Sequence, residues 1–270
     1  KEHSTYCGHW SPATAILYLH RLRPKPELAR VAAETAAFIT SGAERSPDGG
    51  LGHWDGSHQL WVDTLYMACP LLAGVGRDEH KPAYVADAAR QILTYAKVLQ
   101  DEKAGLFYHM WDWQTGERTP ALWGRGNGWV LMSIADVVEA LDRRDPLRGQ
   151  LLGVAKRMMA GLERTRDVAG MWHTVMDDPG SYPETSATAM FTYGVLKLVR
   201  LGALPPAAAH LVEPGWRTIH RVYVKDGLVT GVSAGTVPKA QGYYKQLPAG
   251  VETWGTGAYL MAGAEFDRRR

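Results

Sequence analysis

Cysteine is scarce in this sequence, with only Cys7 and Cys69 among 270 residues. Two cysteines cannot form the disulfide framework of a small secreted domain, and neither lies at a spacing typical of zinc ligands. We therefore expect two buried or incidental thiols in a reducing compartment. The histidines show no metal-ligand spacing and there is no phosphate-binding loop, so we predict neither a metal nor a cofactor.

The sequence also lacks long apolar runs and an excess of charge of one sign. No stretch reaches the ~18 apolar residues that a transmembrane helix needs. The formal net charge is +2, and the Lys and Arg residues are scattered, which argues against nucleic acid or an anionic membrane as a partner. No signal peptide is visible, although the chain starts at Lys1 without a methionine, and we predict a cytoplasmic protein.

Phenylalanine is rare, whereas tryptophan and tyrosine are abundant. The chain has 4 Phe against 10 Trp and 12 Tyr. Trp and Tyr combine a flat apolar face with a polar group, which suits the apolar faces and hydroxyl rims of sugar rings. The composition therefore favours a carbohydrate ligand.

Helical periodicity dominates the chain, and alternating strand patterns are nearly absent. A hydrophobic content of 46% in 270 residues allows one large core, so we expect a single domain over residues 1–270. Proline stands in or near the first turn of several expected helices. The expected helices are 11–22, 26–41, 59–75, 82–99, 127–141, 146–164, 185–201, 206–221 and 254–266.

The expected helices alternate between two kinds, and so do the loops. Helices such as GNGWVLMSIADVVEAL are apolar on most sides, whereas helices such as PLRGQLLGVAKRMMAGL carry a charged stripe. The loops that lead into the apolar helices are long and rich in aromatic, His and acidic residues. Stacked helical hairpins would bring all these loops to one face, so an α/α toroid is predicted; the alternative is a plain helical bundle.

Several segments resemble the unsaturated rhamnogalacturonyl hydrolases, which form glycoside hydrolase family 105 and are related to the unsaturated glucuronyl hydrolases of family 88. The resemblance rests on QLWVDTLYMACPLLAGVG, GLFYHMWD, WGRGNGW, YPETSATAMFTYGVLKLVRLG and GTGAYLMAGAE, and it extends from about Ser11 to the C-terminus. It implies an all-α (α/α)6 barrel of twelve helices, of which about three are absent or lie before Lys1. We expect upstream residues or a partner chain to cover the apolar surface that such a barrel would expose.

The same resemblance implies an unusual hydrolysis. The enzymes of this family remove a 4,5-unsaturated uronic acid from the non-reducing end of oligosaccharides by hydrating its C4=C5 vinyl ether. Asp63, in WVDTLYM, resembles the catalytic acid and base of the family. A helix N-terminus favours the anion by about 0.3–1 kcal/mol, whereas burial raises a carboxyl pKa by up to about 3–5 units, so we expect Asp63 to hold a proton in a dry pocket.

The motif WGRGNGW supplies the expected substrate contacts. Arg125 is suited to grip the planar carboxylate of the substrate bidentately. The glycines at 124, 126 and 128 are expected to let the backbone approach the sugar. Trp129 resembles an aromatic wall of the pocket, and Asn127 is expected to cap the following helix.

Further residues are assigned to the substrate site by the resemblance. His109, in GLFYHMWD, matches a histidine that touches the unsaturated sugar. Trp123 and Gln59 are expected as supporting contacts.

The sequence departs from the family at two positions. An aspartate that usually precedes the Asn-Pro of an inner helix is replaced in CGHWSP by Gly8 and His9, and His9 or Asp55 could take its place. A lysine common ten residues before the catalytic aspartate is His53 here. Both histidines are expected beside the substrate, and both can be neutral, which suggests a leaving sugar other than the common pectin-derived one.

Two alternatives remain open at this point. An inverting glycosidase would need a second carboxyl group about 6.5–9.5 Å from Asp63. The candidates for it are Asp55, Asp112, Glu184 and Glu252. A sugar-binding protein that has lost catalysis is the other alternative, and the oligomeric state stays undetermined.

Overall fold

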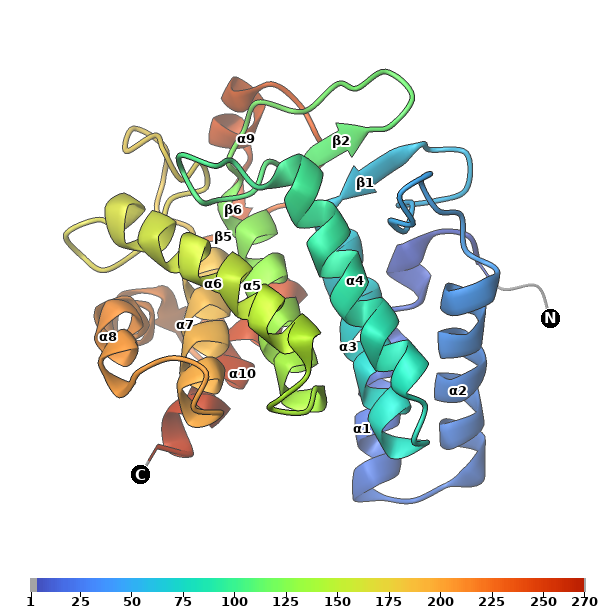
Figure 1. Ribbon diagram of the computed structural model, residues 1–270. Helices are drawn as coiled ribbons and strands as arrows, with labels where there is room; N and C mark the ends of the chain where they lie inside the picture. The colour runs from blue at the N-terminus through green and yellow to red at the C-terminus, as the bar shows by residue number, and fades with distance from the viewer. Residues whose placement is uncertain (1–3, 270) are drawn as a thin grey trace.

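The computed structural model describes residues 4–269, which fold mainly as paired helices in two layers (Figure 1). An inner row packs side by side, and four outer helices pair with inner ones as hairpins. The inner helices are α1 (Pro12–Leu22), α3 (Val62–Asp78), α5 (Gly124–Ala140), α7 (Thr185–Arg200) and α10 (Thr253–Asp267). The outer helices are α2 (Pro26–Ser41), α4 (Pro82–Leu99), α6 (Pro146–Thr165) and α8 (Ala209–Thr218).

The long loops gather at the end of the molecule where the inner helices begin, as the alternation of loops predicts (Figure 1). These loops carry short antiparallel strand pairs and one short helix. The strands are β1 (Gln59–Trp61) with β2 (Met110–Asp112), β3 (Val224–Lys225) with β4 (Leu228–Val229), and β5 (Val232–Ser233) with β6 (Ala249–Gly250). The short helix is α9 (Gln241–Gln246).

Most of the expected helices are present, but three of the expected segments have other boundaries. Residues 59–61 form strand β1 and not the first turn of a helix, because Gln59 pairs with Asp112 and Trp61 with Met110. Helix α5 begins at Gly124 and not at 127, so the Arg-Gly-Asn-Gly motif is helical. The segment 206–221 divides into a 3-10 turn at Pro206–Ala208, helix α8 and a π-helical turn at Ile219–Tyr223.

Helices α5 and α7 form the centre of the core because each has neighbours on both sides. A Cβ added at Gly128 of α5 would lie 2.7 Å from the Met190 side chain of α7, and one at Gly194 of α7 would lie 2.7 Å from Leu131. The two glycines therefore let these helices approach more closely than larger residues would allow. This contact fixes how the N-termini of the two helices lie beside each other.

The C-terminal halves of α5 and α7 share a group of charges, which we call the ion cluster (buried Asp136 and Lys197 with the partly buried Glu139). The Lys197 ammonium lies 2.7 Å from Asp136 Oδ1 and 2.8 Å from Glu139 Oε2. Its side chain is only 4% exposed. Each buried charge thus has an oppositely charged partner, as burial requires.

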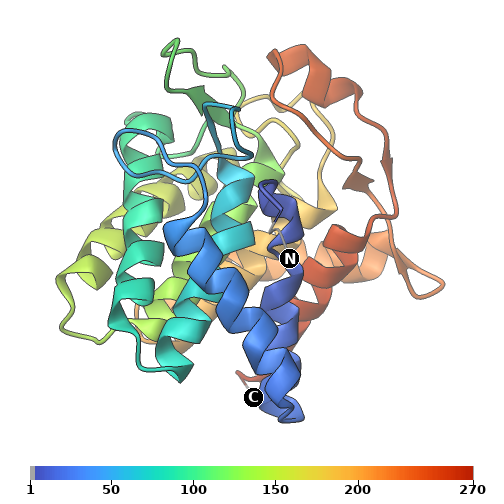
Figure 2. The same ribbon diagram turned by 90° about the vertical axis from the view of Figure 1, so that its right-hand side faces the viewer.

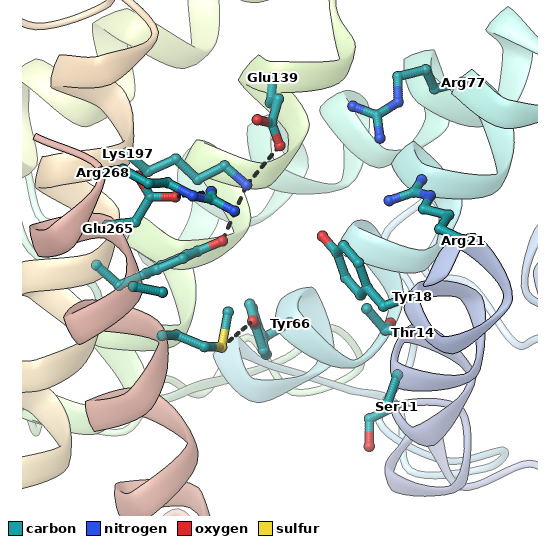
Figure 3. Close-up of a pocket in the computed structure, with 14 residues that line it drawn as sticks. Ser11, Thr14, Tyr18, Arg21, Tyr66, Arg77, Glu139, Lys197, Glu265 and Arg268 are labelled. Carbon is teal, nitrogen blue, oxygen red and sulfur yellow. Dashed lines mark hydrogen bonds and ion pairs between the residues drawn. The ribbon is translucent and has the colours of Figure 1, made fainter. Parts of the chain in front are cut away.

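The inner row is open between α1 and α10, and a cavity of about 590 Å³ lies there (Figure 3). Tyr18 and Arg21 line it from α1, and Met261 and Glu265 line it from α10. Figure 2 shows both helices on the same side of the molecule. Apolar side chains are exposed on each of them, including Leu22 at 79% and Leu260 at 63%. The expected exposure of apolar surface is therefore present; its cover by further residues or a partner stays a prediction.

Three further observations bear on the expectations from the sequence. Cys7 and Cys69 are both free and buried, as predicted, and burial raises the pKa of each thiol. No helix within residues 4–269 is both long and apolar enough to cross a membrane. Over the same residues, no group of three or more His, Cys, Asp or Glu side chains is arranged to hold a metal ion.

Candidate active site

Asp63 lies in the first turn of α3, at the end of the molecule where the long loops meet. The N–H of Val62 donates to the His109 carbonyl at 3.0 Å, which fixes the start of α3 against the strand β2 region. Asp63 Oδ2 lies 3.1 Å from His109 Nε2, and the Asp63 side chain is 14% exposed. A carboxylate and an imidazole are thus in hydrogen-bond contact at a point that solvent still reaches.

The protonation of Asp63 differs from the expectation. Burial raises its pKa, but the hydrogen bond from His109 and the positive charge of Arg125 act in the opposite direction, and the net pKa is lowered. The expectation that burial prevails is therefore wrong for this structure. Without a substrate, Asp63 is ionised at neutral pH.

His109 lies at the centre of the site, between Asp63 and an aromatic layer. It is completely buried, and its Nδ1 is 2.8 Å from the Tyr244 hydroxyl of α9. Its ring lies 4.3 Å from the ring of Trp123 and 5.5 Å from that of Trp61. Both ring nitrogens have hydrogen-bond partners and two indole rings pack against the imidazole, which holds it in one orientation.

Arg125, in the first turn of α5, is the nearby fixed positive charge. It is 3% exposed, and its guanidinium lies 4.6 Å from the Trp123 ring and 5.2 Å from the Trp254 ring. Burial lowers its pKa. We refer to Asp63, His109 and Arg125 as the catalytic cluster, in which Trp123 contacts both His109 and Arg125 and so connects them.

The expected bidentate grip of Arg125 on a substrate is not available in this structure. Nη1 donates to the Ser233 carbonyl at 2.9 Å and to the Ser233 hydroxyl. Nη2 donates to the Ala234 carbonyl at 3.0 Å and to Thr236 Oγ1 at 2.8 Å. The loop after β5 therefore occupies the fork that was expected to hold the carboxylate.

The glycines and the asparagine of the motif have structural roles that differ from the expectations. A Cβ at Gly124 would lie 2.5 Å from the His173 carbonyl, and one at Gly126 would lie 2.7 Å from the Trp123 ring, so these residues allow close packing within the protein. Asn127 does not cap α5. Its Oδ1 accepts from the Phe107 N–H at 2.7 Å and its Nδ2 donates to the Phe107 carbonyl at 2.9 Å, which ties the loop before β2 to α5.

Trp129 and Gln59 lie near the catalytic cluster without a recorded contact to it. Trp129 stacks on Tyr66 at 5.0 Å. Trp129 follows Arg125 by four positions and Tyr66 follows Asp63 by three, so the stacked pair lies one helical turn further along α5 and α3. Gln59 Oε1 accepts from the Trp61 indole at 2.8 Å and so orients a ring that contacts His109.

The two substituted positions differ in their surroundings. His53 stacks on Trp61 at 4.1 Å, and burial lowers the pKa of His53 to about 4, so it is neutral at neutral pH. This neutrality agrees with the loss of the family's lysine charge. His9 is exposed, and its Nδ1 lies 2.6 Å from Ser4 Oγ.

The carboxylates considered as partners for Asp63 are mostly engaged elsewhere. Glu184 is fully buried and caps α7, accepting from the N–H groups of Ser186 and Ala187 at 3.1 and 2.7 Å. Asp112 accepts from two main-chain N–H groups in the turn after β2. Asp55 is exposed, whereas Glu252 is partly buried and precedes α10 without capping it. Because Glu184 is engaged in this cap, it is not free to act as the second carboxyl group of an inverting glycosidase.

Tyr244 and the loop at 233–236 were not anticipated from the sequence. Both lie in the connection from outer helix α8 to inner helix α10. The rule that long loops lead into inner helices applies to this connection as well, and its Tyr243–Tyr244 pair is a usable signal. The contacts of these residues with His109 and Arg125, however, span more than a hundred positions of the chain.

The cavity between α1 and α10 does not coincide with the catalytic cluster. Asp63, His109 and Arg125 are absent from the described residues that line the space between α1 and α10. An ionised aspartate, an oriented histidine and a buried arginine lie together at the loop end, which makes this end the candidate active site.

Comparisons with known proteins identify the family of this chain. The model of the family "Glycosyl Hydrolase Family 88" matches residues 4–270. The unsaturated rhamnogalacturonyl hydrolase YesR of Bacillus subtilis is 31% identical over 255 residues, which are 91% of this chain and 72% of YesR. An unsaturated 3S-rhamnoglycuronyl hydrolase of Alteromonas is 30% identical over 79% of this chain and 53% of its own length.

A solved structure extends the agreement to the whole fold. The crystal structure of a possible member of family GH105 from Salmonella enterica superposes with a TM-score of 0.90 at 29% identity, covering 96% of this chain and 71% of that chain. The predicted family resemblance and the predicted (α/α)6 barrel class are thereby confirmed.

Proposed function

Because this chain belongs to glycosyl hydrolase family 88, we propose that it removes a 4,5-unsaturated uronic acid from the non-reducing end of lyase-generated oligosaccharides. The observation that carries the proposal is the contact between Asp63 and His109 at the loop end, with Arg125 beside them. Two relatives are named as unsaturated rhamnogalacturonyl and unsaturated 3S-rhamnoglycuronyl hydrolases, which supports an unsaturated uronyl oligosaccharide as the substrate of this chain.

The proposed reaction is a hydration in which Asp63 acts twice. The protonated carboxyl of Asp63 gives its proton to C4, and the C4=C5 pair of electrons forms the new C–H bond, leaving positive charge shared by C5 and the ring oxygen. Water then adds to C5, and Asp63 takes the proton that this water loses. The hemiketal so formed opens, and the next sugar leaves from C1 with its glycosidic oxygen.

Asp63 must take up a proton before this reaction, since it is ionised in the free protein. Substrate binding supplies two effects that raise the pKa of a carboxyl group. The sugar displaces water from the partly exposed side chain, and the carboxylate of the substrate brings a second negative charge close to the first. Binding and protonation are therefore coupled in this proposal.

His109 and Arg125 have electrostatic roles in the proposed reaction. When Asp63 gives up its proton, the hydrogen bond from His109 stabilises the carboxylate that forms. Arg125 provides a fixed positive charge at the N-terminus of α5. This charge attracts the substrate carboxylate even while the guanidinium donates its hydrogen bonds to the 233–236 loop. Neutral His53 adds no charge for the leaving sugar, so we propose a neutral sugar in that position.

The direct test is a panel of unsaturated disaccharides made by lyases from rhamnogalacturonan, ulvan and glycosaminoglycans. The ultraviolet absorbance of the conjugated double bond should fall on at least one of them. Asp63→Asn should keep binding of that disaccharide and lose its turnover. An absence of absorbance loss on every substrate, with binding retained, would favour the sugar-binding protein instead.

A further inference from the structure

We infer that Tyr244 is a positioning residue that fixes His109 as the Nε2–H tautomer, so that the imidazole donates a hydrogen bond to Asp63. The inference rests on the proposed function and assigns a role to a residue from the last long loop. Tyr244 belongs to the short helix α9 and is completely buried. Its hydroxyl lies 2.8 Å from His109 Nδ1, on the opposite side of the ring from Asp63.

The acceptor side of the network fixes one end of the imidazole. An ionised carboxylate has lone pairs and no proton to give, so it can only accept. Asp63 Oδ2 lies 3.1 Å from His109 Nε2, and the nitrogen must therefore carry the hydrogen of this bond. The opposite arrangement would direct two lone pairs at each other.

The donor side fixes the other end independently. The Tyr244 oxygen already accepts from the Lys239 main-chain N–H at 3.3 Å. If Nδ1 of His109 also carried a hydrogen, the Tyr244 hydroxyl proton would need another acceptor, and the recorded hydrogen bonds of residues 4–269 provide none. A buried donor without a partner is strongly unfavourable, so the hydroxyl donates to a bare Nδ1. Both ends give the same neutral tautomer.

This tautomer matters at the moment when Asp63 transfers its proton to C4. The Nε2–H then points at the carboxylate on which negative charge develops, and the bond strengthens as the charge forms. In the other tautomer, a lone pair would face that charge. Without the Tyr244 hydroxyl, the histidine keeps its ring contacts but loses the group that selects the tautomer.

Tyr244→Phe separates the hydroxyl from the ring, which also packs against Trp123 at 6.1 Å. We expect kcat to fall roughly tenfold to a hundredfold, in the range found when a partner that orients a histidine is removed, with KM changed by less than about twofold. Tyr243→Phe is the matched control, because it removes a hydroxyl from the adjacent ring at 5.7 Å, and kcat should stay at the wild-type value.

A second readout does not depend on turnover. In 15N-labelled protein without substrate, the His109 ring, assigned with His109→Gln, should show a protonated Nε2 and an unprotonated Nδ1 at neutral pH. Tyr244→Phe should replace this pattern with an averaged or shifted pair of signals, while Tyr243→Phe keeps it. Circular dichroism and thermal unfolding establish that each variant is folded.

Three results would overturn the inference: a wild-type ring protonated at Nδ1, a Tyr244→Phe ring with the wild-type pattern, or a changed pattern with unchanged kcat. If no unsaturated sugar is turned over by the wild type, the proposed function fails instead, and the ring signals still decide the tautomer. The two failures are therefore distinguishable.

Discussion

The ion cluster and the catalytic cluster both bury charge, yet they compensate it in different ways. In the ion cluster, Lys197 lies within 2.8 Å of two carboxylates. In the catalytic cluster, Arg125 donates to main-chain and hydroxyl oxygens of Ser233, Ala234 and Thr236, which are neutral. Lys197 of the ion cluster thus has carboxylates as direct partners, whereas the hydrogen-bond acceptors of the Arg125 guanidinium are neutral oxygens.

The pKa directions express the same difference. Burial lowers the pKa of Lys197, but the carboxylates of Asp136 and Glu139 outweigh burial, and the net pKa is raised. For Arg125, burial outweighs the attraction of Glu184 and Asp63, and the net pKa is lowered. The comparison teaches that direct carboxylate partners outweigh the cost of burying Lys197, whereas neutral acceptors and more distant carboxylates do not outweigh the cost of burying Arg125.

The largest effect is expected from Asp63→Asn. The amide keeps the shape of the side chain but cannot transfer the proton, so the turnover of an unsaturated disaccharide should fall by about 10²–10⁴-fold. Initial rates of absorbance loss measure the change, and calorimetric titration with the same disaccharide should show binding close to wild type. A variant with wild-type turnover would contradict the assignment of Asp63.

Breaking the ion cluster should affect stability and leave the chemistry intact. Lys197→Met leaves the buried Asp136 carboxylate without its cation, while Glu139 keeps Arg200 at 3.2 Å, and we expect the free energy of unfolding to fall by about 3 kcal/mol. Urea unfolding measures this loss, while kcat of the folded protein should not change.

Lys97→Met is the matched control for that variant, since Lys97 pairs with Asp48 at 2.8 Å with side chains that are 70% and 52% exposed. Its cost should stay below about 1 kcal/mol. Equal losses at the two lysines would show that burial does not distinguish the ion cluster from a surface pair.

A smaller loss of stability is expected when one of the neutral oxygens that accept hydrogen bonds from Arg125 is removed. Ser233→Ala removes one hydroxyl acceptor and keeps the Ser233 carbonyl, so the free energy of unfolding should fall by about 1 kcal/mol. Urea unfolding again provides the measurement. A loss as large as that of Lys197→Met would mean that Arg125 depends on this loop as strongly as Lys197 depends on its carboxylates.

The smallest effect concerns pH. The folded-state pKa of Asp63 is lowered, so its ionisation stabilises the fold above the unfolded pKa of about 3.9, and this contribution is lost as the pH falls through the folded value. The difference in unfolding free energy between wild type and Asp63→Asn should therefore be constant near neutral pH and shrink below about pH 4. A difference that grows with acidification would have the wrong sign.

The elements that follow local rules could be predicted from the sequence. Helices α2, α4 and α6 begin with a proline at Pro26, Pro82 and Pro146, where the missing N–H costs nothing, and they keep one apolar face. The sequence predicts the start of α5 three residues late, since Asn127 is a residue type that commonly caps a helix. The glycines at the start of α5 are required by close neighbours, including His173 and Met190, that the local sequence does not reveal.

Three residues of the candidate site could be predicted to lie together, but their contacts could not. The alternation of loops and the family motifs bring Asp63, His109 and Arg125 to one end of the barrel. The partners of Arg125 lie more than a hundred residues later in the chain, as does Tyr244, the partner of His109. The balance between burial and hydrogen bonding at Asp63 likewise depends on distances, so the sign of its pKa shift needed the structure.

The measurement that tests the central claim most directly compares two time courses in one reaction. The absorbance of the C4=C5 bond and the concentration of the released sugar are followed together on an unsaturated disaccharide. If Asp63 protonates C4, the absorbance falls before or together with release, and Asp63→Asn abolishes both. Release of the sugar while the absorbance persists would contradict the account, because the attack would then occur at C1.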